Sequence, residues 1–308
     1  MSKKVFVLID GHAIIYRAYH AFPELSTPSG MLANAIYGFT RILLTVIRDF
    51  HPEFLAVTFD HPELTFRHQQ YAEYKAHREK MPDDLIPQVD EIKKIVKVLN
   101  IPQFEVTGFE ADDLIGTLSR EGEARSDDVE MMIVTGDKDL LQLVTGHTHV
   151  FIPGRGKHSV DIEYDPETVK RIMKITPDQV PDYKALMGDP SDNIPGVKGV
   201  GPKTAAALIE QFNDIEHLYQ ALETDADSTK LSQGLINKLI TDKESAFLSK
   251  QLATVDRHAP IKLDLPACMV SGYDKEQAVT ALEELGFKSL IKLLPADDFE
   301  LGVQSALF

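Results

Sequence analysis

The chain has 308 residues, 43% hydrophobic and 26% charged, enough to bury one large core or a core with an appended lobe. Its single cysteine, Cys268, excludes an internal disulfide and a thiolate metal site, and no apolar run approaches the ~18 residues of a membrane span. Because the formal net charge is −16, any binding to nucleic acid has to use local basic segments.

The first half of the sequence alternates strand and helix signals. Apolar runs of strand length are VFVLI, FLAVTF, IPQFEVTGF and VEMMIVTG. Between them, HAIIYRAYHAF and NAIYGFTRILLTVIRDF repeat apolar residues at helical spacing. This pattern predicts an α/β core over residues 1–175, with a mainly parallel central sheet flanked by helices. VFIPGR and HSVDIEYD predict a hairpin or an edge pair of strands.

Helical signals dominate from Pro166 onward. The clearest are VPDYKALM, KTAAALIEQF, SQGLINKLITDKESAFLSKQLATV and DKEQAVTALEELGF. We therefore expect a helical region over residues 176–294. Pro295 breaks the last helix, and the acidic residues after it predict a flexible tail over residues 295–308.

Short acidic clusters are the most informative feature of the chain, and several of them directly follow a predicted strand. They contain Asp10, Asp60, Glu110, Asp112, Asp113, Asp137, Asp139, Asp189 and Asp192. Open α/β sheets bind ligands at the carboxyl ends of their strands, so we expect these carboxylates to lie together. Carboxylates this close repel one another unless cations lie between them, which predicts a two-metal site for phosphate chemistry. Taken singly, an Asp after a strand is more often a helix N-cap or a turn residue than a metal ligand.

Residues 65–80, TFRHQQYAEYKAHREK, interleave basic and aromatic side chains shortly after Asp60. We interpret them as a nucleic-acid grip, in which cations hold phosphates and rings stack on bases. The alternative is a solvated surface helix of mixed charge. The run IPQVDEIKKIVKVLN that follows predicts an amphipathic helix. The expected contact residues are Arg67, Tyr71, Tyr74, Lys75 and Arg78.

A second binding element is GDPSDNIPGVKGVGPKTAAALI, in which a glycine-rich turn joins two helical runs. Its glycines permit close backbone approach, so that main-chain amides and the next helix N-terminus can face a phosphate. The alternative is an ordinary helix end and turn. We predict a helix–hairpin–helix at about 180–213 that grips duplex DNA. Its expected contact residues are Gly196, Lys198, Gly199, Gly201, Lys203 and Thr204.

Together these motifs resemble the 5′ nucleases of the flap-endonuclease superfamily. The resemblance is strongest to the N-terminal 5′-3′ exonuclease domain of bacterial DNA polymerase I and its free-standing relatives, and it runs from Val5 to about Leu294. It rests on IDGHAIIYRAYHA, NAIYGFTR, TFDHPELTFRHQQYAEYKAHR, GFEADDLIGTL, IVTGDKDLLQLV, PDYKALMGDPSDNIPGVKGVGPKTA and LEELGFKSL. His12 and Ala13 depart from the small polar residues that relatives often carry after Asp-Gly.

The resemblance implies a structure-specific 5′-3′ exonuclease and flap endonuclease of primer removal and repair. Two Mg²⁺ ions, with Mn²⁺ as a substitute, would support hydrolysis of DNA phosphodiesters to 5′-phosphate and 3′-hydroxyl ends. Asp10, Asp60, Glu110 and Asp112 would hold the first ion, and the second would use Asp113, Asp137, Asp139, Asp189 and Asp192.

The resemblance also implies a helical arch at about 62–100, with Tyr74, Lys75 and Arg78 at its base. Lys75 and Arg78 would neutralise the phosphate in the transition state, so they join Asp10 and Asp112 as expected catalytic residues. A K⁺ ion on main-chain oxygens would support the hairpin.

At the C-terminus, Gln304, Leu307 and Phe308 resemble a short peptide that docks on the sliding clamp, although Ser305 departs from it. The alternatives are a tail that packs on its own domain and a linker to a polymerase. We expect a monomer in the bacterial cytoplasm, associated with the nucleoid and not with a membrane.

Two other functions are open on the sequence alone, a non-catalytic flap-binding protein and an RNA-directed nuclease with a similar sheet. The sequence also leaves open whether exonuclease or flap cleavage dominates, and whether the chain is free-standing or part of a polymerase.

Overall fold

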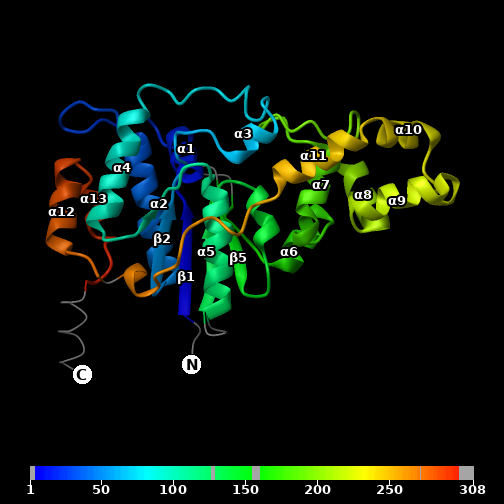
Figure 1. Cartoon of the computed structure of the whole chain (residues 1–308). Coiled ribbons are helices and arrows are strands. Elements are labelled where there is room, and N and C mark those ends of the chain that lie inside the picture. The colour runs from blue at the N-terminus through cyan, green and yellow to red at the C-terminus, as the bar shows by residue number, and fades with distance from the viewer. Residues whose placement is uncertain (1–3, 126–128, 155–159, 271, 298–308) are drawn as a thin grey trace.

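A six-stranded sheet lies at the centre of the computed structural model, with helices on both faces and a helical lobe extending to one side (Figure 1). The structure describes residues 4–125, 129–154, 160–270 and 272–297. The strands are β1 (Lys4–Asp10), β2 (Phe54–Thr58), β3 (Gln103–Phe104), β4 (Val129–Val134), β5 (Thr148–Ile152) and β6 (Ile162–Tyr164). Their order is β3-β2-β1-β4-β5-β6, and only the β5–β6 pair is antiparallel. The predicted parallel sheet and edge pair are confirmed.

The third predicted strand, IPQFEVTGF, is much shorter than expected. Only the two residues of β3 pair with β2. The chain then turns at Gly108, where φ is +85°, a conformation that favours glycine. This turn directs the next residue pair, Phe109 and Glu110, to the start of α5 (Ala111–Arg125).

Successive residues of β1 point to opposite faces of the sheet, and each set enters a different core. Phe6 and Leu8 pack with α5 and the lobe, whereas Val7 and Ile9 pack with helices on the other face. Those helices are α1 (Gly11–Ala21), α2 (Asn34–Phe50) and α4 (Ile86–Val98), which confirms the amphipathic runs of the sequence.

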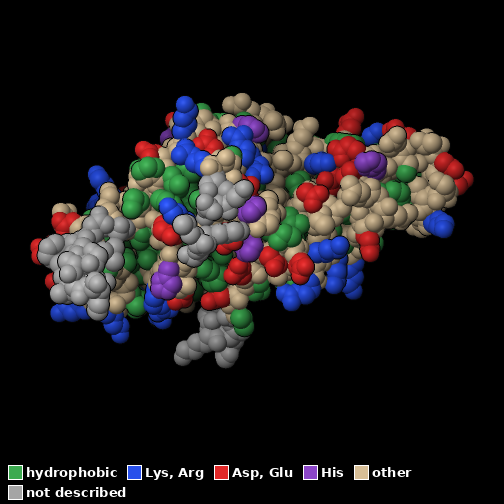
Figure 2. Space-filling model, turned by 90° about the horizontal axis from the view of Figure 1, so that it is seen from below, with side chains coloured by type: hydrophobic (Ala, Val, Ile, Leu, Met, Phe, Trp, Pro, Cys, Tyr) green, Lys and Arg blue, Asp and Glu red, His purple; other side chains and the backbone are tan. Residues whose placement is uncertain are grey.

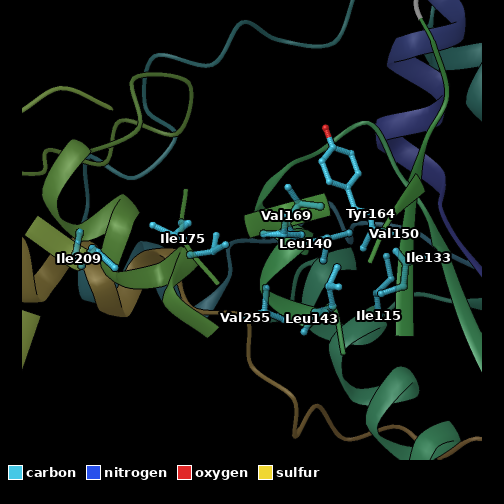
Figure 3. Packing of buried hydrophobic residues seen from close by; sticks show 14 of the residues in the cluster. Ile115, Ile133, Leu140, Leu143, Val150, Tyr164, Val169, Ile175, Ile209 and Val255 are labelled. Carbon is cyan, nitrogen blue, oxygen red and sulfur yellow. The ribbon is translucent and has the colours of Figure 1, made fainter. Parts of the chain in front are cut away.

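The first of these cores continues from the sheet into the lobe. Figure 3 shows Ile133 of β4 and Val150 of β5 near Ile115 of α5, with Leu140 of the 3₁₀ helix η1 (Asp139–Leu143) against them. The same cluster reaches Ile209 in the lobe. The lobe is therefore joined to the sheet by shared apolar packing.

The lobe consists of helices that follow the sheet in the chain. They are α6 (Pro166–Met173), η3 (Pro177–Gln179), α7 (Val180–Met187), α8 (Pro202–Phe212), α9 (Ile215–Asp225), η4 (Ala226–Thr229), α10 (Gln233–Thr241) and α11 (Lys243–Ala253). One long helical run was expected where α10 and α11 lie. The two helices separate at Asp242, whose side chain accepts a hydrogen bond from the backbone N–H of Lys198 (2.8 Å).

The last helices return to the sheet domain. After η5 (Pro266–Cys268), α12 (Lys275–Glu284) packs against α4, and α13 (Lys288–Ile291) packs against α2. Leu282 and Leu290 are buried in the same core as Val7 and Ile9. The predicted helical region 176–294 is therefore not one packing unit, because its last part completes the core of the sheet.

The face at the amino ends of the strands carries Lys and Arg interspersed with Asp and Glu (Figure 2). Within the described ranges, no helix has the length and apolar character needed to cross a membrane.

Candidate functional site

The carboxyl ends of β1, β2 and β4 and the start of α5 surround a cavity of about 760 Å³. One face of α1 also lines this cavity. Of the nine predicted metal ligands, the cavity brings together Asp10, Asp60, Glu110, Asp112 and Asp137. Lys75 and Arg78 line the cavity as well, so the two cations expected to neutralise the phosphate in the transition state lie beside the carboxylates.

Asp10 ends β1 and caps α1. One carboxylate oxygen accepts the N–H of Ala13 (3.1 Å) and the other accepts the hydroxyl of Thr135 (2.7 Å). The Asp10 side chain therefore caps α1 and also lines the acidic cavity. Burial raises its pKa to about 7, with Asp60 and Asp137 adding to the rise and the hydrogen bonds opposing it.

Asp112 lies in the first turn of α5 and faces the cavity. In the described part of the chain it has no hydrogen-bond or ion-pair partner. Burial, together with the charges of Asp10 and Asp137, raises its pKa well above the ordinary value. A buried carboxylate without a partner, close to other carboxylates, has the chemistry of a ligand for a hard divalent cation.

Asp60 and Asp137 are fixed by hydrogen bonds at the ends of their strands. Asp60 accepts the N–H of Ala111 (2.8 Å), which ties β2 to the start of α5. The N–H of Asp137 donates to the Thr135 hydroxyl (2.9 Å), the same hydroxyl that donates to Asp10. Thr135 thus links the ends of β1 and β4, a role that the sequence did not reveal.

Glu110 is paired with protein cations. Its carboxylate contacts the ammonium of Lys75 (2.9 Å) and accepts the Tyr74 hydroxyl (3.1 Å). Burial acts to raise the pKa of Glu110, but Lys75 and Arg67 outweigh it and hold the pKa below its ordinary value.

The segment expected to form a helical arch has a different structure. It contains one short helix, α3 (Phe66–Gln70), followed by turns, and the next helix, α4, belongs to the core. The turns are docked on the lobe, because the N–H of Lys75 donates to the carbonyl of Asp192 (2.9 Å) and the Asn193 amide donates to the carbonyl of Glu73 (2.6 Å).

The two tyrosines of this segment face the protein. Tyr74 is only 3% exposed and packs with Ile194 and Leu252, with Tyr71 against the same cluster. In this conformation, therefore, the Tyr74 ring has no face free to stack on a base.

Arg67 and Asp113 form a buried ion pair away from the cavity. The guanidinium donates to both carboxylate oxygens at 2.8 Å, and the two residues are 2% and 0% exposed. Asp113 also accepts the N–H groups of Glu110 and Asp256. Neither side chain lines the cavity, and both are engaged inside the fold, so the expected metal role of Asp113 and DNA role of Arg67 stay predictions.

The remaining acidic residues are tied to cations of the chain. Lys184 lies between Asp139 and Asp189, and Arg78 pairs with Asp192 (3.0 Å). Lys184 was not singled out in the sequence, although it lies five residues before Asp189 in YKALMGD. None of these three carboxylates lines the cavity. Across the described ranges, no group of three or more His, Cys, Asp or Glu side chains is arranged to enclose a metal ion.

The predicted hairpin is formed by the loop between α7 and α8. Gly196 approaches Gly188 so closely that a Cβ would lie 2.3 Å from the Gly188 nitrogen. Its N–H donates to Ser249 (2.9 Å), and its carbonyl accepts the Ser245 hydroxyl (2.8 Å). The amides of Gly196 and Lys198 are consequently used inside the protein, and they are not directed at a phosphate.

The outer part of the hairpin is accessible. Lys198, Gly199 and Lys203 are exposed. Because Ala205 donates the first hydrogen bond of α8, to the carbonyl of Gly201, the amides of Lys203 and Thr204 precede the helical ladder. Lys238 of α10, missed in the sequence, extends its ammonium toward the carbonyl of Gly199 (3.5 Å).

Two family models match this chain. The 5′-3′ exonuclease, N-terminal resolvase-like domain, matches residues 5–174, and the 5′-3′ exonuclease, C-terminal SAM fold, matches residues 175–276. The chain therefore belongs to the 5′-3′ exonuclease family.

Similar curated proteins include DNA polymerase I of Bacillus subtilis (strain 168), which is 40% identical over 306 residues, covering 99% of this chain and 34% of the relative. DNA polymerase I of Chloroflexus aurantiacus is 42% identical over 304 residues, covering 96% of this chain and 31% of the relative. The chain spans about a third of the length of these curated relatives.

Solved structures share the fold at low sequence identity. T5 5′-exonuclease, described with bound divalent zinc ions, has a TM-score of 0.67 at 19% identity and covers 98% of this chain and 99% of its own. The catalytic core of Rad2 in complex with DNA substrate has a TM-score of 0.60 at 17% identity and covers 95% and 92%. This likeness supports a 5′ nuclease fold, as the sequence predicted.

Proposed function

We propose that this chain hydrolyses DNA phosphodiesters near a 5′ end or at a 5′ flap, with two divalent metal ions, Mg²⁺ foremost. The observation that carries the proposal is the cavity that combines five of the predicted metal ligands with Lys75 and Arg78. Membership of the 5′-3′ exonuclease family supports it, and so do relatives described with divalent ions and with DNA substrate.

Asp10, Asp112 and Asp137 would hold the ions, with Asp60 and Glu110 at the edge of the same cavity. Divalent ions bound there would activate a water for attack on phosphorus and stabilise the leaving 3′ oxygen. The donor set fits hard cations, because it consists of oxygen atoms and Asp112 has no partner in the described chain. Asp139 and Asp189 could join only if Lys184 moved away from them.

Lys75 and Arg78 would stabilise the negative charge that develops on the phosphate. Both are held near the cavity by carboxylates, Lys75 by Glu110 and Arg78 by Asp192. These ion pairs fix the two cations before a substrate arrives, so little reorganisation is needed during the reaction.

The hairpin would hold the duplex through its backbone and read no base sequence. Lys198 and Lys203 would supply charge, and the first amides of α8 would supply hydrogen-bond donors. The K⁺ site implied by the resemblance stays a prediction, and the carbonyls of Gly196 and Gly199 already receive donors from Ser245 and Lys238.

The test is a titration of Mg²⁺ with a labelled 5′-flap duplex under single-turnover conditions. Asp112→Asn should slow cleavage by about 100-fold or more, because one electrostatic partner of a transition state is worth this much. Asp90→Asn, on the exposed face of α4, is the matched control and should cleave like the wild type.

Thermal unfolding gives a second readout. Mg²⁺ should raise the melting temperature of the wild type and of Asp90→Asn more than that of Asp112→Asn, because bound ions stabilise the folded state. Full activity in excess chelator, or equal cleavage by the two variants, would refute the metal-dependent nuclease. Tight flap binding without cleavage by the wild type would instead favour a non-catalytic flap-binding protein.

Three finer expectations stay predictions. Clamp binding by Gln304, Leu307 and Phe308 concerns residues outside the described ranges. The monomeric state and the cytoplasmic, nucleoid-associated location stay predictions of the sequence.

A further inference from the structure

One face of α1 lines the cavity without contributing to the proposed metal ligands. Its residues His12, Tyr16 and His20 recur at the four-residue spacing of a helix face. Among them, His12 alone contacts a carboxylate residue of the cavity through a described hydrogen bond, since the backbone N–H of Asp60 donates to its Nδ1 (3.0 Å).

This hydrogen bond determines where the imidazole carries its proton. An Nδ1 that accepts an N–H has no proton of its own, so in the neutral ring the proton is on Nε2. The ring also stands edge-on to Phe59, with centroids 5.8 Å apart, so its orientation is fixed by packing.

The Nε2–H group is therefore a donor of known position without a known acceptor. Within the described ranges, no hydrogen-bond partner of Nε2 is present, and the side chain is 15% exposed at the cavity wall. Because Nε2 is protonated, His12 cannot be a metal ligand through this atom. The acceptor has to come from a molecule that enters the cavity.

We propose that His12 contacts the substrate, its Nδ1 holding the backbone of Asp60 while its Nε2–H donates to a non-bridging phosphate oxygen of the DNA. The inference rests on the proposed function, because it takes DNA as the substrate. A neutral donor suits this position, since it orients the phosphate without placing another cation beside the metal ligands.

Two substitutions separate the two nitrogen atoms. In His12→Asn the amide oxygen lies near the position of Nδ1 and can still accept the N–H of Asp60, but no donor reaches the position of Nε2. In His12→Gln the longer side chain places an amide N–H near Nε2 and leaves Asp60 without its acceptor. His51→Asn is the matched control, because His51 is exposed, ends α2 and has φ +45°, a conformation that Asn tolerates.

The measurements are single-turnover cleavage of a 5′-flap duplex in Mg²⁺, with substrate concentration varied to separate binding from chemistry, and the melting temperature of each variant. His12→Asn should lose about 10-fold or more in cleavage efficiency, as expected for one hydrogen bond to a charged group. His12→Gln and His51→Asn should stay within about threefold of the wild type. The melting temperature of His12→Asn should equal that of the wild type.

Three results would overturn the inference. Wild-type cleavage by His12→Asn would exclude the contact at Nε2. Impairment of His12→Gln alone would reduce His12 to a residue that positions Asp60. Equal losses in both variants, with lower melting temperatures, would show a purely structural role. Failure of the proposed function is distinguishable from all three, because the wild type itself would then not cleave in Mg²⁺.

Discussion

Replacing Arg67 by methionine should destabilise the fold and leave the DNA-binding surface intact. The guanidinium makes two hydrogen bonds to Asp113 and donates to the carbonyls of Leu252 (2.9 Å) and Thr254 (2.8 Å). Its removal leaves the fully buried Asp113 without its cation. Breaking a buried pair by removing one partner costs about 3–5 kcal/mol, so we expect a loss of this size in the free energy of unfolding.

Urea unfolding followed by far-ultraviolet circular dichroism measures this loss. Arg41→Met is the control, since Arg41 is exposed on α2, and it should change the free energy by less than about 0.5 kcal/mol. In the double variant Arg67→Met, Asp113→Leu, the cost should fall below that of Arg67→Met, because no unpaired charge remains. Unchanged stability of Arg67→Met together with weaker flap binding would refute the structural role and restore Arg67 as a DNA contact.

Three further predictions concern the cavity and the hairpin. Lys75→Met should lower the single-turnover rate by about 100-fold and change the Kd for flap DNA much less; a change in Kd alone would contradict this. Lys203→Ala should weaken duplex binding and reduce its salt-dependence slope by about one unit, as measured by fluorescence anisotropy. In chelator, the melting temperature should fall between about pH 4 and pH 7, from the ordinary pKa of the Asp10 carboxyl to its raised value in the fold. Because the pKa of Asp10 is raised to about 7, the folded state loses stability as the pH rises and this carboxyl ionises. Mg²⁺ should reduce this fall in melting temperature.

The part of the site that the sequence predicted is the part that follows from the sheet. Asp10, Asp60 and Asp137 come directly after apolar runs, and parallel strands end at one edge of a sheet, so their approach follows from local patterns alone. The unbroken apolar run of β1 likewise agrees with the predicted sheet flanked by helices, since both of its faces are covered by apolar packing.

The inward orientation of Asp113 follows from helix geometry that the acidic pattern alone does not show. Neighbouring residues of an α-helix point about 100° apart, so Asp112 and Asp113 in the first turn of α5 cannot both face one cavity. A helical interpretation of FEADDLIGTL was available, and it already implied that one of the two carboxylates turns inward. The partner of that carboxylate was not predictable, because Arg67 lies 46 residues earlier in the chain and reaches Asp113 only through tertiary folding.

The structure of the segment around Lys75 was not predictable from its sequence for a related reason. Its basic and aromatic residues are as typical of a segment that binds nucleic acid as of one that packs on its own protein, and composition does not distinguish the two. The docking depends on Asp192 and Asn193, which lie more than a hundred residues later. The carbonyl of Asp192 accepts the N–H of Lys75, and the side-chain amide of Asn193 donates to the carbonyl of Glu73. Only the folded chain brings these segments together.

The acidic clusters are neutralised in two different ways, and this division explains how so many carboxylates coexist. The outer ones have cations of the chain beside them, as Asp113 has Arg67 and Asp139 has Lys184. The inner ones differ among themselves: Glu110 has Lys75 beside it, whereas Asp112 has no hydrogen-bond or ion-pair partner in the described ranges. Burial, together with the charges of neighbouring carboxylates, raises the pKa values of Asp10 and Asp112. A fold that pairs the outer carboxylates with Lys and Arg but gives Asp112 no partner leaves this part of the cavity to cations from solution, which is what a metal-dependent site requires.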